Sequence, residues 1–262
     1  MQAARHPFLD HDGPLPIVHR GGAGEAHENS MAAFQRAVDL GYSYVETDVQ
    51  ATADGVLLAF HDGSLSRVTD RTGRICELTY AEVAKARIGG EEPIPLLIDL
   101  LTTFPGVRFN IDSKHPATLR PLVDVLTRTR ALDRVCLASF SDRRLDFLRT
   151  ALGPGMCSSL GPREVARLTA ASLPGPLGRW RRPQFASTAL CVQVPPGAGP
   201  LPLVTRRFVE TSHRLGLVVH VWTLDDANQI DHVLDLGVDG VMTDRPEVLR
   251  DVLLRRGQWH SE

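Results

Sequence analysis

Residues 17–50, IVHRGGAGEAHENSMAAFQRAVDLGYSYVETDVQ, form the first strand–helix–strand pattern of the chain. The β-rich run Ile17–His19 comes first, and the amphipathic segment Ser30–Leu40 follows with apolar residues at helical spacing. Gly41 ends that helical pattern, and a second β-rich run covers Tyr44–Gln50. A strand, a helix and a second strand in this order predict a parallel βαβ unit.

The same alternation continues along nearly the whole chain. Further strands are expected at Val107–Ile111, Val135–Ser139, Met156–Ser159, Thr188–Val194, Val218–Trp222 and Gly240–Thr243. Amphipathic segments separate them at Leu119–Arg130, Asp142–Leu152, Arg163–Ala171, Arg206–Leu215 and Ala227–Leu236. Eight strands alternating with helices predict a (β/α)8 TIM-type barrel that forms a single α/β domain over residues 1–262. An open, doubly wound sheet is the alternative, but no GxGxxG turn follows the first strand.

The composition limits the class of protein. A chain of 262 residues, 43% of them hydrophobic, can bury a large core, and its length fits one barrel as well as two ordinary domains. The formal net charge of −2 argues against binding to nucleic acid. No run approaches the ~18 apolar residues that span a bilayer, and Met1–Gly13 lacks the apolar segment of a signal peptide. We therefore expect no integral membrane segment.

The cysteines indicate the redox environment. The four cysteines are scattered without CxxC spacing, at Cys76, Cys136, Cys157 and Cys191. Three of them lie in apolar runs, where a buried free thiol is expected. This usage favours a reducing compartment, so we expect a cytoplasmic protein.

One segment interrupts the alternation of strands and helices. Asp54-Gly55 stands between Tyr44–Gln50 and a second β-rich run, Val56–His61, and this dipeptide favours a two-residue hairpin turn. Pairing the residues on either side of that turn puts Asp48 opposite His61. Opposite residues of an antiparallel pair share a face, and Glu46 lies on the same face as Asp48. The hairpin is thus expected to bring the three side chains into one cluster.

Two stretches depart from simple βα units. Residues 63–95 follow His61 and hold one short helix, opened by Thr79 with Glu82 three residues later as a capping box. We expect this insertion to form a lid-like wall on the same rim as the cluster. The Pro-, Gly- and Arg-rich stretch Leu173–Pro183 is expected on the opposite rim as a solvated loop, with a partner patch of Trp180 and its neighbouring arginines as the alternative.

Carboxylates at strand ends indicate a metal site. Glu46 and Asp48 would repel each other unless a cation bridges them, and their hard oxygen ligands suit Mg²⁺ or Ca²⁺. Asn110, Asp112 and Lys114 alternate at period two, so they point one way from a later strand. Asp112 is then a third carboxylate for one divalent cation, and Lys114 is a positive charge aimed at a phosphoryl oxygen.

Two histidines at other strand ends suit proton transfer. His19 and His61 each stand at the polar end of an apolar run, and an ordinary histidine pKa of about 6.5 lets such a pair divide the roles of acid and base. Arg20 follows His19 directly and offers a planar fork to a phosphate. The combination of groups favours metal-assisted cleavage of a phosphate ester.

These residues are similar to the motifs of one family, the glycerophosphodiester phosphodiesterases. The matching segments are His19-Arg20-Gly21, Glu28-Asn29-Ser30, Glu46-x-Asp48, Thr52-x-Asp54-Gly55, His61-Asp62, Asn110–Lys114, His220–Thr223 and Gly237–Pro246. The resemblance spans nearly the whole chain. It implies a barrel of the phospholipase C-like phosphodiesterase type and hydrolysis of a small-molecule glycerophosphodiester to glycerol 3-phosphate and an alcohol.

The resemblance also implies roles for individual residues. His19 and His61 match the general acid/base pair, Glu46, Asp48 and Asp112 match metal-binding positions, and Arg20 and Lys114 match phosphate-contacting positions. Gln193 and Trp222 match positions that line the substrate pocket. Three positions depart from the usual pattern, namely Asp112 for glutamate, Ser30 for threonine and His27 for proline.

Two other functions fit parts of the sequence. An enzyme acting on lysophospholipids or sphingomyelin-like lipids would need an exposed apolar rim, for which Leu65, Ile75 and Ile88 of the insertion are the local candidates. A non-catalytic binder of phosphorylated ligands would use the same barrel. The sequence leaves open the alcohol group, the native metal, the division of roles between the histidines, a cyclic phosphate intermediate and the oligomeric state.

Overall fold

The structure is a computed structural model that describes residues 6–22, 27–173, 183–199 and 201–260. The loop expected at Leu173–Pro183, with Trp180, lies almost wholly outside the described residues, so its rim and its role stay predictions.

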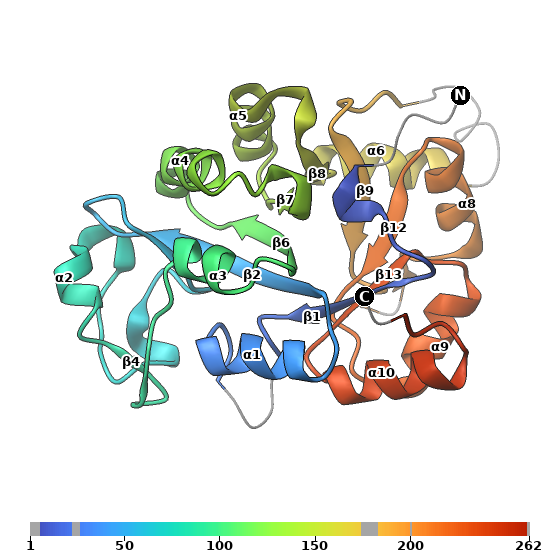
Figure 1. Cartoon of the computed structure of the whole chain (residues 1–262). Coiled ribbons are helices and arrows are strands. Elements are labelled where there is room, and N and C mark those ends of the chain that lie inside the picture. Colours follow the sequence, from blue (N-terminus) through green and yellow to red (C-terminus); the bar gives the residue numbers. More distant parts are fainter. Residues whose placement is uncertain (1–5, 23–26, 174–182, 200, 261–262) are drawn as a thin grey trace.

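Among the described residues, eight parallel strands close into a barrel (Figure 1). Around the barrel they are β1 (Leu15–His19), β2 (Tyr44–Ala51), β6 (Arg108–Ser113), β7 (Val135–Ala138), β8 (Cys157–Ser159), β9 (Ala189–Val194), β12 (Val218–Val221) and β13 (Gly240–Thr243). The last strand pairs with the first, with Met242 opposite Ile17, so the sheet closes on itself. The barrel prediction is confirmed with each strand placed to within two residues, and the open-sheet alternative is wrong.

Helices surround the strands on the outside (Figure 1). They are α1 (Met31–Asp39), α3 (Leu97–Thr103), α4 (Leu119–Thr129), α5 (Asp142–Leu152), α6 (Pro162–Ser172), α8 (Arg206–Arg214), α9 (Ala227–Asp235) and α10 (Pro246–Arg255). At the start of α1, the Ser30 hydroxyl accepts a hydrogen bond from the Ala33 amide at 3.1 Å, which caps the helix where the chain leaves the barrel rim. α3 and α10 were not predicted from the sequence.

The barrel interior has a filled floor. Buried side chains from the strands and from the 3-10 helix η1 (Pro7–Leu9) meet there, among them Phe8, Ile17, Tyr44, Cys136, Cys157, Cys191 and Met242. The Tyr44 hydroxyl donates to the Phe8 carbonyl at 2.9 Å and fixes η1 against the barrel. The three interior cysteines are free thiols, as expected. Polar side chains further along the strands therefore lie above this floor, at the carboxyl ends of the strands, where barrel active sites form.

The hairpin after β2 differs from the expectation by one residue. The strand β3 (Leu57–Ala59) pairs antiparallel with β2, with Val49 opposite Ala59, and the Phe60 amide donates to the Asp48 carbonyl at 2.9 Å. Asp48 is therefore opposite Phe60, and the predicted pairing of Asp48 with His61 is wrong.

Local hydrogen bonds explain the different register. The Thr52 amide donates to the Val56 carbonyl at 3.0 Å, which makes Ala53-Asp54-Gly55 a three-residue loop. The Thr52 hydroxyl donates to Asp54 Oδ1 at 2.6 Å and accepts from the Val56 amide at 2.9 Å. Gly55 takes a left-handed conformation at φ +82°, which a three-residue hairpin loop requires at this position.

β3 nevertheless returns the chain to the rim of the barrel. β1 pairs with the first half of β2, up to His19 opposite Glu46, and β3 pairs with the second half. β3 thus extends the same edge of β2 and runs back toward the end of β1. Because β3 ends at Ala59, the chain then turns, and the Gln50 side chain donates to the His61 carbonyl at 2.9 Å. This turn, and not the alternation of faces, directs His61 toward the site.

Residues 63–95 form a small subregion beside the barrel (Figure 1, left). Its elements are η2 (Leu65–Arg67), η3 (Ile75–Glu77), α2 (Tyr80–Val83), β4 (Arg87–Ile88) and β5 (Glu92–Pro93). The capping box at α2 is confirmed, since the Thr79 amide donates to Glu82 Oε2 at 2.7 Å. Leu65, Ile75 and Ile88 are at most 1% exposed in a core of their own with Leu58 and Phe60, so their prediction as an apolar rim is wrong.

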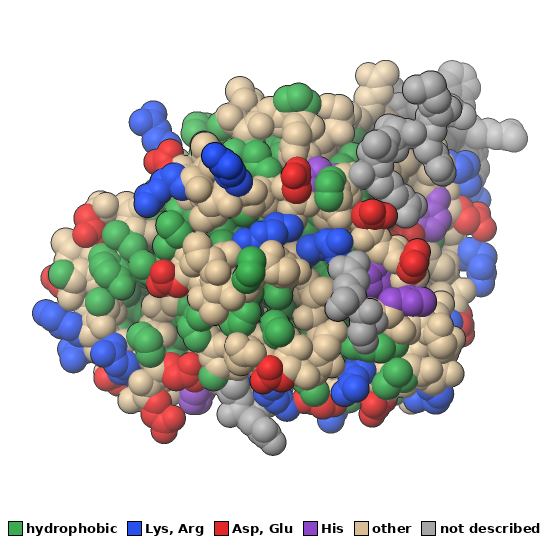
Figure 2. All heavy atoms as spheres, in the orientation of Figure 1, with side chains coloured by type: hydrophobic (Ala, Val, Ile, Leu, Met, Phe, Trp, Pro, Cys, Tyr) green, Lys and Arg blue, Asp and Glu red, His purple; other side chains and the backbone are tan. Residues whose placement is uncertain are grey.

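Among the described residues, no helix is long and apolar enough to cross a membrane. On the face shown in Figure 2, acidic and basic side chains are interspersed, as the net charge of −2 suggests.

Candidate active site

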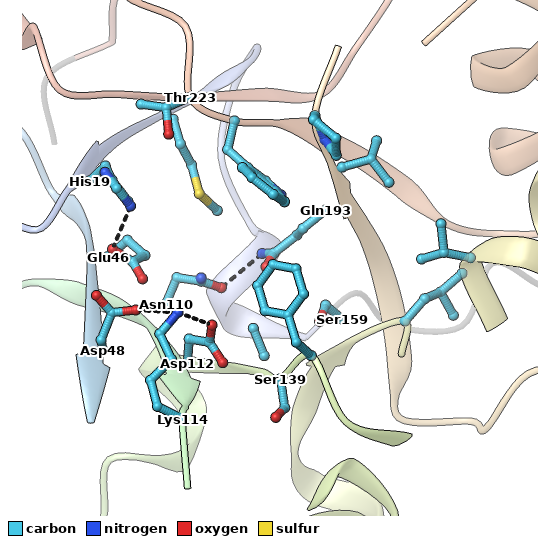
Figure 3. A pocket seen from close by; sticks show the side chains of 18 of the residues that line it. His19, Glu46, Asp48, Asn110, Asp112, Lys114, Ser139, Ser159, Gln193 and Thr223 are labelled. Atoms are coloured by element: carbon cyan, nitrogen blue, oxygen red, sulfur yellow. Dashed lines mark hydrogen bonds and ion pairs between the residues drawn. The ribbon is translucent and has the colours of Figure 1, made fainter. Parts of the chain in front are cut away.

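A cavity of about 500 Å³ opens at the carboxyl ends of the barrel strands. Every site residue predicted from the sequence lines it, namely His19, Arg20, Glu46, Asp48, His61, Asp112, Lys114, Gln193 and Trp222. Figure 3 shows the labelled carboxylates of β2 and β6 close together, with His19 and Lys114 beside them.

The turn after β1 places Arg20 over the carboxylates. Arg20 has a left-handed backbone at φ 54°, which is uncommon for a residue with a side chain and recurs at functional sites. Its Nε lies 2.8 Å from Asp48 Oδ2, and its backbone amide donates to Glu46 Oε2 at 3.2 Å. The next residue, Gly21, has no room for a side chain, because a Cβ there would lie 2.7 Å from Ala33 Cβ.

His19 is held from both sides. Its Nδ1 lies 2.7 Å from Asp244 Oδ1, and its Nε2 lies 3.8 Å from Glu46 Oε2. An ionised carboxylate such as Asp244 accepts hydrogen bonds but cannot donate them. The Nδ1 of His19 must therefore be the donor, so the single ring proton of neutral His19 lies on Nδ1. Burial alone would lower the pKa of His19, but Glu46 and Asp244 outweigh it and raise that pKa.

Asp244 was missed as a site residue in the sequence analysis. It follows β13 directly, and β13 is the barrel neighbour of β1. A closed barrel therefore brings its strand end beside His19, and that closure is the signal that would have identified it.

The three predicted metal ligands lie on adjoining strands. Glu46 and Asp48 share the inner face of β2, and Asp112 is opposite Asp48 on β6. Lys114 Nζ lies 2.8 Å from Asp48 Oδ1 and 2.7 Å from Asp112 Oδ2, so the lysine bridges the two carboxylates. The positive charges of Lys114 and Arg20 thus offset the carboxylates in this structure.

The pKa values show how these carboxylates differ. Burial and the neighbouring Asp48 raise the pKa of Glu46 to about 8. Burial would also raise the pKa of Asp48, but Lys114 and Arg20 lower it below its ordinary value. For Asp112, burial outweighs Lys114 and raises the pKa. Removing these side chains from water is costly unless further positive charge compensates them.

The donor set fits a hard divalent cation. Three buried carboxylates converge, and Asp112 Oδ1 has no hydrogen-bond partner among the described residues. Carboxylate oxygens are the ligands that Mg²⁺ and Ca²⁺ prefer. As the side chains stand, no three His, Cys, Asp or Glu residues in the described ranges are gathered as a ready-made metal site. Lys114 lies where a cation would compete for the same oxygens.

His61 enters the cavity from the end of the hairpin. Its Nδ1 lies 2.5 Å from Asp62 Oδ1, so an acidic side chain holds this ring too. Both predicted acid/base histidines therefore have a carboxylate at Nδ1, and the Nε2 of His19 also faces Glu46 Oε2 at 3.8 Å.

The two residues predicted on the later strands, Gln193 and Trp222, line the cavity. Gln193 on β9 donates to Asn110 Oδ1 on β6 at 2.8 Å, across the barrel interior (Figure 3). The fully buried His220, opposite Gln193 on the neighbouring strand β12, has its Nδ1 3.3 Å from the same Gln193 nitrogen. Trp222 packs edge-to-face on Phe140, with ring centroids 5.8 Å apart.

The cavity has two halves of different character. The charged half is formed by β1, β2 and β6, with Arg20 just after β1, His61 just after β3 and Lys114 just after β6. The other half comes from β7, β8, β9 and β12 with α6 and nearby loops, and it is mostly apolar. Its apolar residues are Phe140, Leu160, Pro162, Val165, Val194, Pro195, Leu203 and Trp222, and its polar ones are Ser139, Ser159, Gln193 and Thr223. Figure 3 shows side chains made of carbon alone on this side of the view, beside the labelled Ser139, Ser159 and Gln193. Of this half, Gln193 and Trp222 were predicted from the sequence, and its other residues were not.

Comparison with known proteins identifies the same family as the sequence motifs. Residues 19–248 match the glycerophosphoryl diester phosphodiesterase family. A probable glycerophosphodiester phosphodiesterase 2 of Mycobacterium tuberculosis is 40% identical over 254 residues, which cover 96% of this chain and 95% of that protein.

Solved structures share the fold. A putative glycerophosphoryl diester phosphodiesterase from Silicibacter pomeroyi has a TM-score of 0.78 at 21% identity, covering 97% of this chain and 98% of the other. An Oleispira antarctica phosphodiesterase, solved in complex with the product sn-glycerol-3-phosphate, has a TM-score of 0.75 at 24% identity, covering 92% and 97%.

Proposed function

The chain belongs to the glycerophosphoryl diester phosphodiesterase family, and from this premise we propose that it hydrolyses glycerophosphodiesters to glycerol 3-phosphate and an alcohol. The observation that carries the proposal is the meeting of His19, Arg20, Asp48, His61 and Lys114 in one cavity at the carboxyl end of the barrel. These groups can bind a phosphate, neutralise its charge and transfer protons.

Arg20 and Lys114 bind the phosphate in this proposal. Both cations are already held at the carboxylates, Arg20 at Asp48 and Lys114 between Asp48 and Asp112. These ion pairs hold both cations at the cavity before substrate arrives, where they can stabilise charge that develops on the phosphoryl oxygens.

Glu46, Asp48 and Asp112 would hold one divalent cation, Mg²⁺ or Ca²⁺. When bound, such a cation supplies positive charge that stabilises the phosphoryl oxygens during the reaction. The buried carboxylates and the unpartnered Asp112 Oδ1 support this assignment.

His19 and His61 divide the proton transfers. One ring removes a proton from the attacking oxygen, and the other protonates the departing alkoxide; each transfer is worth roughly 10²–10⁴-fold in rate. The carboxylates at Nδ1, Asp244 for His19 and Asp62 for His61, keep each ring oriented.

A coupled assay for glycerol 3-phosphate tests the proposed function. Glycerophosphocholine, glycerophosphoethanolamine and glycerophosphoinositol are supplied with Mg²⁺ or Ca²⁺, and we expect turnover that EDTA abolishes and the cation restores. Full activity after EDTA would contradict the metal assignment. Calorimetric binding of these phosphodiesters without turnover would instead favour the non-catalytic binder.

The apolar half of the cavity favours a second candidate, hydrolysis of glycerophosphodiesters that carry a hydrocarbon chain, such as lysophospholipids. Phe140 is 64% exposed at this half of the cavity, while Leu160 and Val165 line it more deeply. Each methylene that such a surface fully buries is worth about fourfold in binding.

Soluble short-chain substrates test this candidate without micelles. We expect kcat/KM to rise from glycerophosphocholine through its hexanoyl to its octanoyl derivative, and Val165→Gln to reduce that rise. Ala166→Gln, on the exposed neighbouring position of α6, is the matched control. Equal kcat/KM values for all chain lengths would reject the candidate and leave the principal proposal intact.

The free thiols support a cytoplasmic location, which we also propose. Cys136 Sγ and Cys191 Sγ lie 3.6 Å apart, well beyond the ~2.05 Å of a disulfide bond. Cell fractionation with an antibody to the chain tests the location.

A further inference from the structure

Arg67, in η2 of the insertion, lies between two carboxylates at the rim of the site. Its Nε donates to Asp62 Oδ2 at 2.5 Å, and its Nη2 reaches Asp62 Oδ1 at 3.2 Å. On its other edge, Nη1 donates to Glu28 Oε2 at 3.0 Å and Nη2 to Glu28 Oε1 at 2.5 Å. One guanidinium thus holds two carboxylates, each through two hydrogen bonds.

Each of these carboxylates contacts a residue of the proposed machinery. Asp62 Oδ1 lies 2.5 Å from His61 Nδ1. Glu28 Oε1 accepts from Arg20 Nη1 at 3.2 Å. Arg67 itself does not line the cavity. Arg67 is therefore connected to His61 through the single side chain of Asp62, and to Arg20 through that of Glu28.

The hydrogen-bond geometry distinguishes Arg67 from an ordinary surface ion pair. A single exposed pair contributes little, because solvent screens it and two flexible side chains must be ordered. Arg67 uses four of its five N–H groups in two forked interactions, a geometry that fixes direction as well as distance. Partial burial alone would raise the pKa values of Glu28 and Asp62, but the hydrogen bonds from Arg67 help to lower both.

The insertion has packing of its own besides the hydrogen bonds of Arg67. Leu65, two residues earlier, is 1% exposed in the core of the insertion with Phe60, Ile75 and Val83. A separate contact also ties the insertion to the β1–α1 loop, since the His27 ring fills the space where a Cβ on Gly89 would lie. The two forks of Arg67 are thus additional to the packing that holds this subregion.

We propose that Arg67 is a positioning residue, through which the insertion sets the orientation of His61 by way of Asp62 and of Arg20 by way of Glu28. The inference rests on the proposed function, since it assigns no role to Arg67 apart from those two residues. It gives the insertion a part in catalysis that needs no contact with the substrate.

Steady-state kinetics of Arg67→Ala test the proposal, with the glycerophosphodiester that the wild type turns over fastest. A catalytic group displaced by about 1 Å can lose up to 10²-fold in rate, so we expect kcat to fall at least about tenfold. Arg67→Lys, which keeps the charge but not the fork, should recover a part of that loss. Arg71→Ala is the matched control, since Arg71 is exposed in the same insertion and donates to the Lys85 carbonyl, away from the site.

A double-mutant cycle separates positioning from a general structural effect. If Arg67 acts on His61 through Asp62 and on Arg20 through Glu28, Arg67→Ala should cost less than about threefold in kcat when added to Asp62→Asn combined with Glu28→Gln. The melting temperature of the single variant Arg67→Ala should match that of Arg71→Ala. A kcat for Arg67→Ala within twofold of the Arg71→Ala value, or full multiplication of the two losses in the cycle, would overturn the proposal. A wild type without turnover would instead reject the proposed function itself.

Discussion

His19 Nδ1 lies 2.7 Å from Asp244 Oδ1, although 225 positions separate the two residues in the chain. The contact exists because β13 is the neighbour of β1 in the closed barrel, so the last strand end orients the histidine at the first. Asp244 is itself held, since its amide donates to Asp225 Oδ1 at 2.7 Å.

Asp244→Asn should lower kcat by about 10²-fold or more while the fold is kept. The amide N–H of an asparagine at this position can donate a hydrogen bond to Nδ1, which favours the wrong tautomer of His19. The same change of tautomer lowers kcat about 10⁴-fold in a serine protease triad. Asp239→Asn is the matched control, because Asp239 also pairs with a histidine, His213, at 2.7 Å but does so outside the cavity. A kcat for Asp244→Asn equal to that of the control would show that Asp244 does not orient the ring.

Replacing either His19 or His61 by alanine should lower kcat by at least about 100-fold, because each would remove one proton transfer. The measurement is turnover in the glycerol 3-phosphate assay at saturating substrate. His232→Ala, on the exposed side of α9, should turn over at the wild-type rate. Near wild-type turnover in either active-site variant would rule out the acid/base pair.

The metal-free protein should lose thermal stability as the pH rises from about 5 to about 8. Glu46 has its pKa raised from 4.5 to about 8 in the folded chain, so in this range the folded state keeps a proton that the unfolded state releases. The raised pKa of His19 acts in the same direction. Its contribution to the free energy of unfolding is complete below pH 6.5 and is lost as the pH rises through the pKa of His19 in the folded chain.

Melting temperatures at several pH values check this prediction. Mg²⁺ or Ca²⁺ should raise the melting temperature more at pH 8 than at pH 6, because a bound cation competes with the proton at these carboxylates. Glu46→Gln should flatten the dependence. A metal-free melting temperature that rises across this range would contradict the raised pKa.

Gly21→Ala should destabilise the fold by about 3 kcal/mol or more. A left-handed backbone with a side chain costs about 1–2 kcal/mol, and the new Cβ at 2.7 Å from Ala33 Cβ adds a steric clash with α1. Gly55→Ala is the control, since Gly55 has a similar φ of +82° but open space around it. Chemical denaturation should show a loss of about 1–2 kcal/mol in the free energy of unfolding for Gly55→Ala. Equal losses for the two variants would show that the contact with Ala33 adds nothing.

Much of the fold could be predicted because its signals are local. The strand at Tyr44–Ala51 alternates between core and cavity, and the helix at Met31–Asp39 repeats apolar residues at helical spacing, so each pattern identifies its element. The polar residues at the strand ends, such as Glu46 and Lys114, could be grouped because a parallel barrel brings these ends to one rim.

The parts that were missed depend on contacts that no local pattern records. The hairpin register was decided by the hydroxyl of Thr52, which bonds both Asp54 and the Val56 amide and so favours a loop longer by one residue. Phe140 became part of the cavity because it packs on Trp222, a residue of a distant strand. Such interactions become visible when the chain is folded.

The three-residue loop Ala53–Gly55 sets a limit on how this chain can evolve. Because successive side chains of β3 face opposite sides, a one-residue insertion or deletion there would exchange the face of Ala59 for that of Phe60 and move His61 away from its turn at Gln50. Residues 63–95 pack on a core of their own beyond that point, so changes of length among them need not reach the histidine. Related chains should therefore differ freely in the size of this subregion and share the length of one short turn.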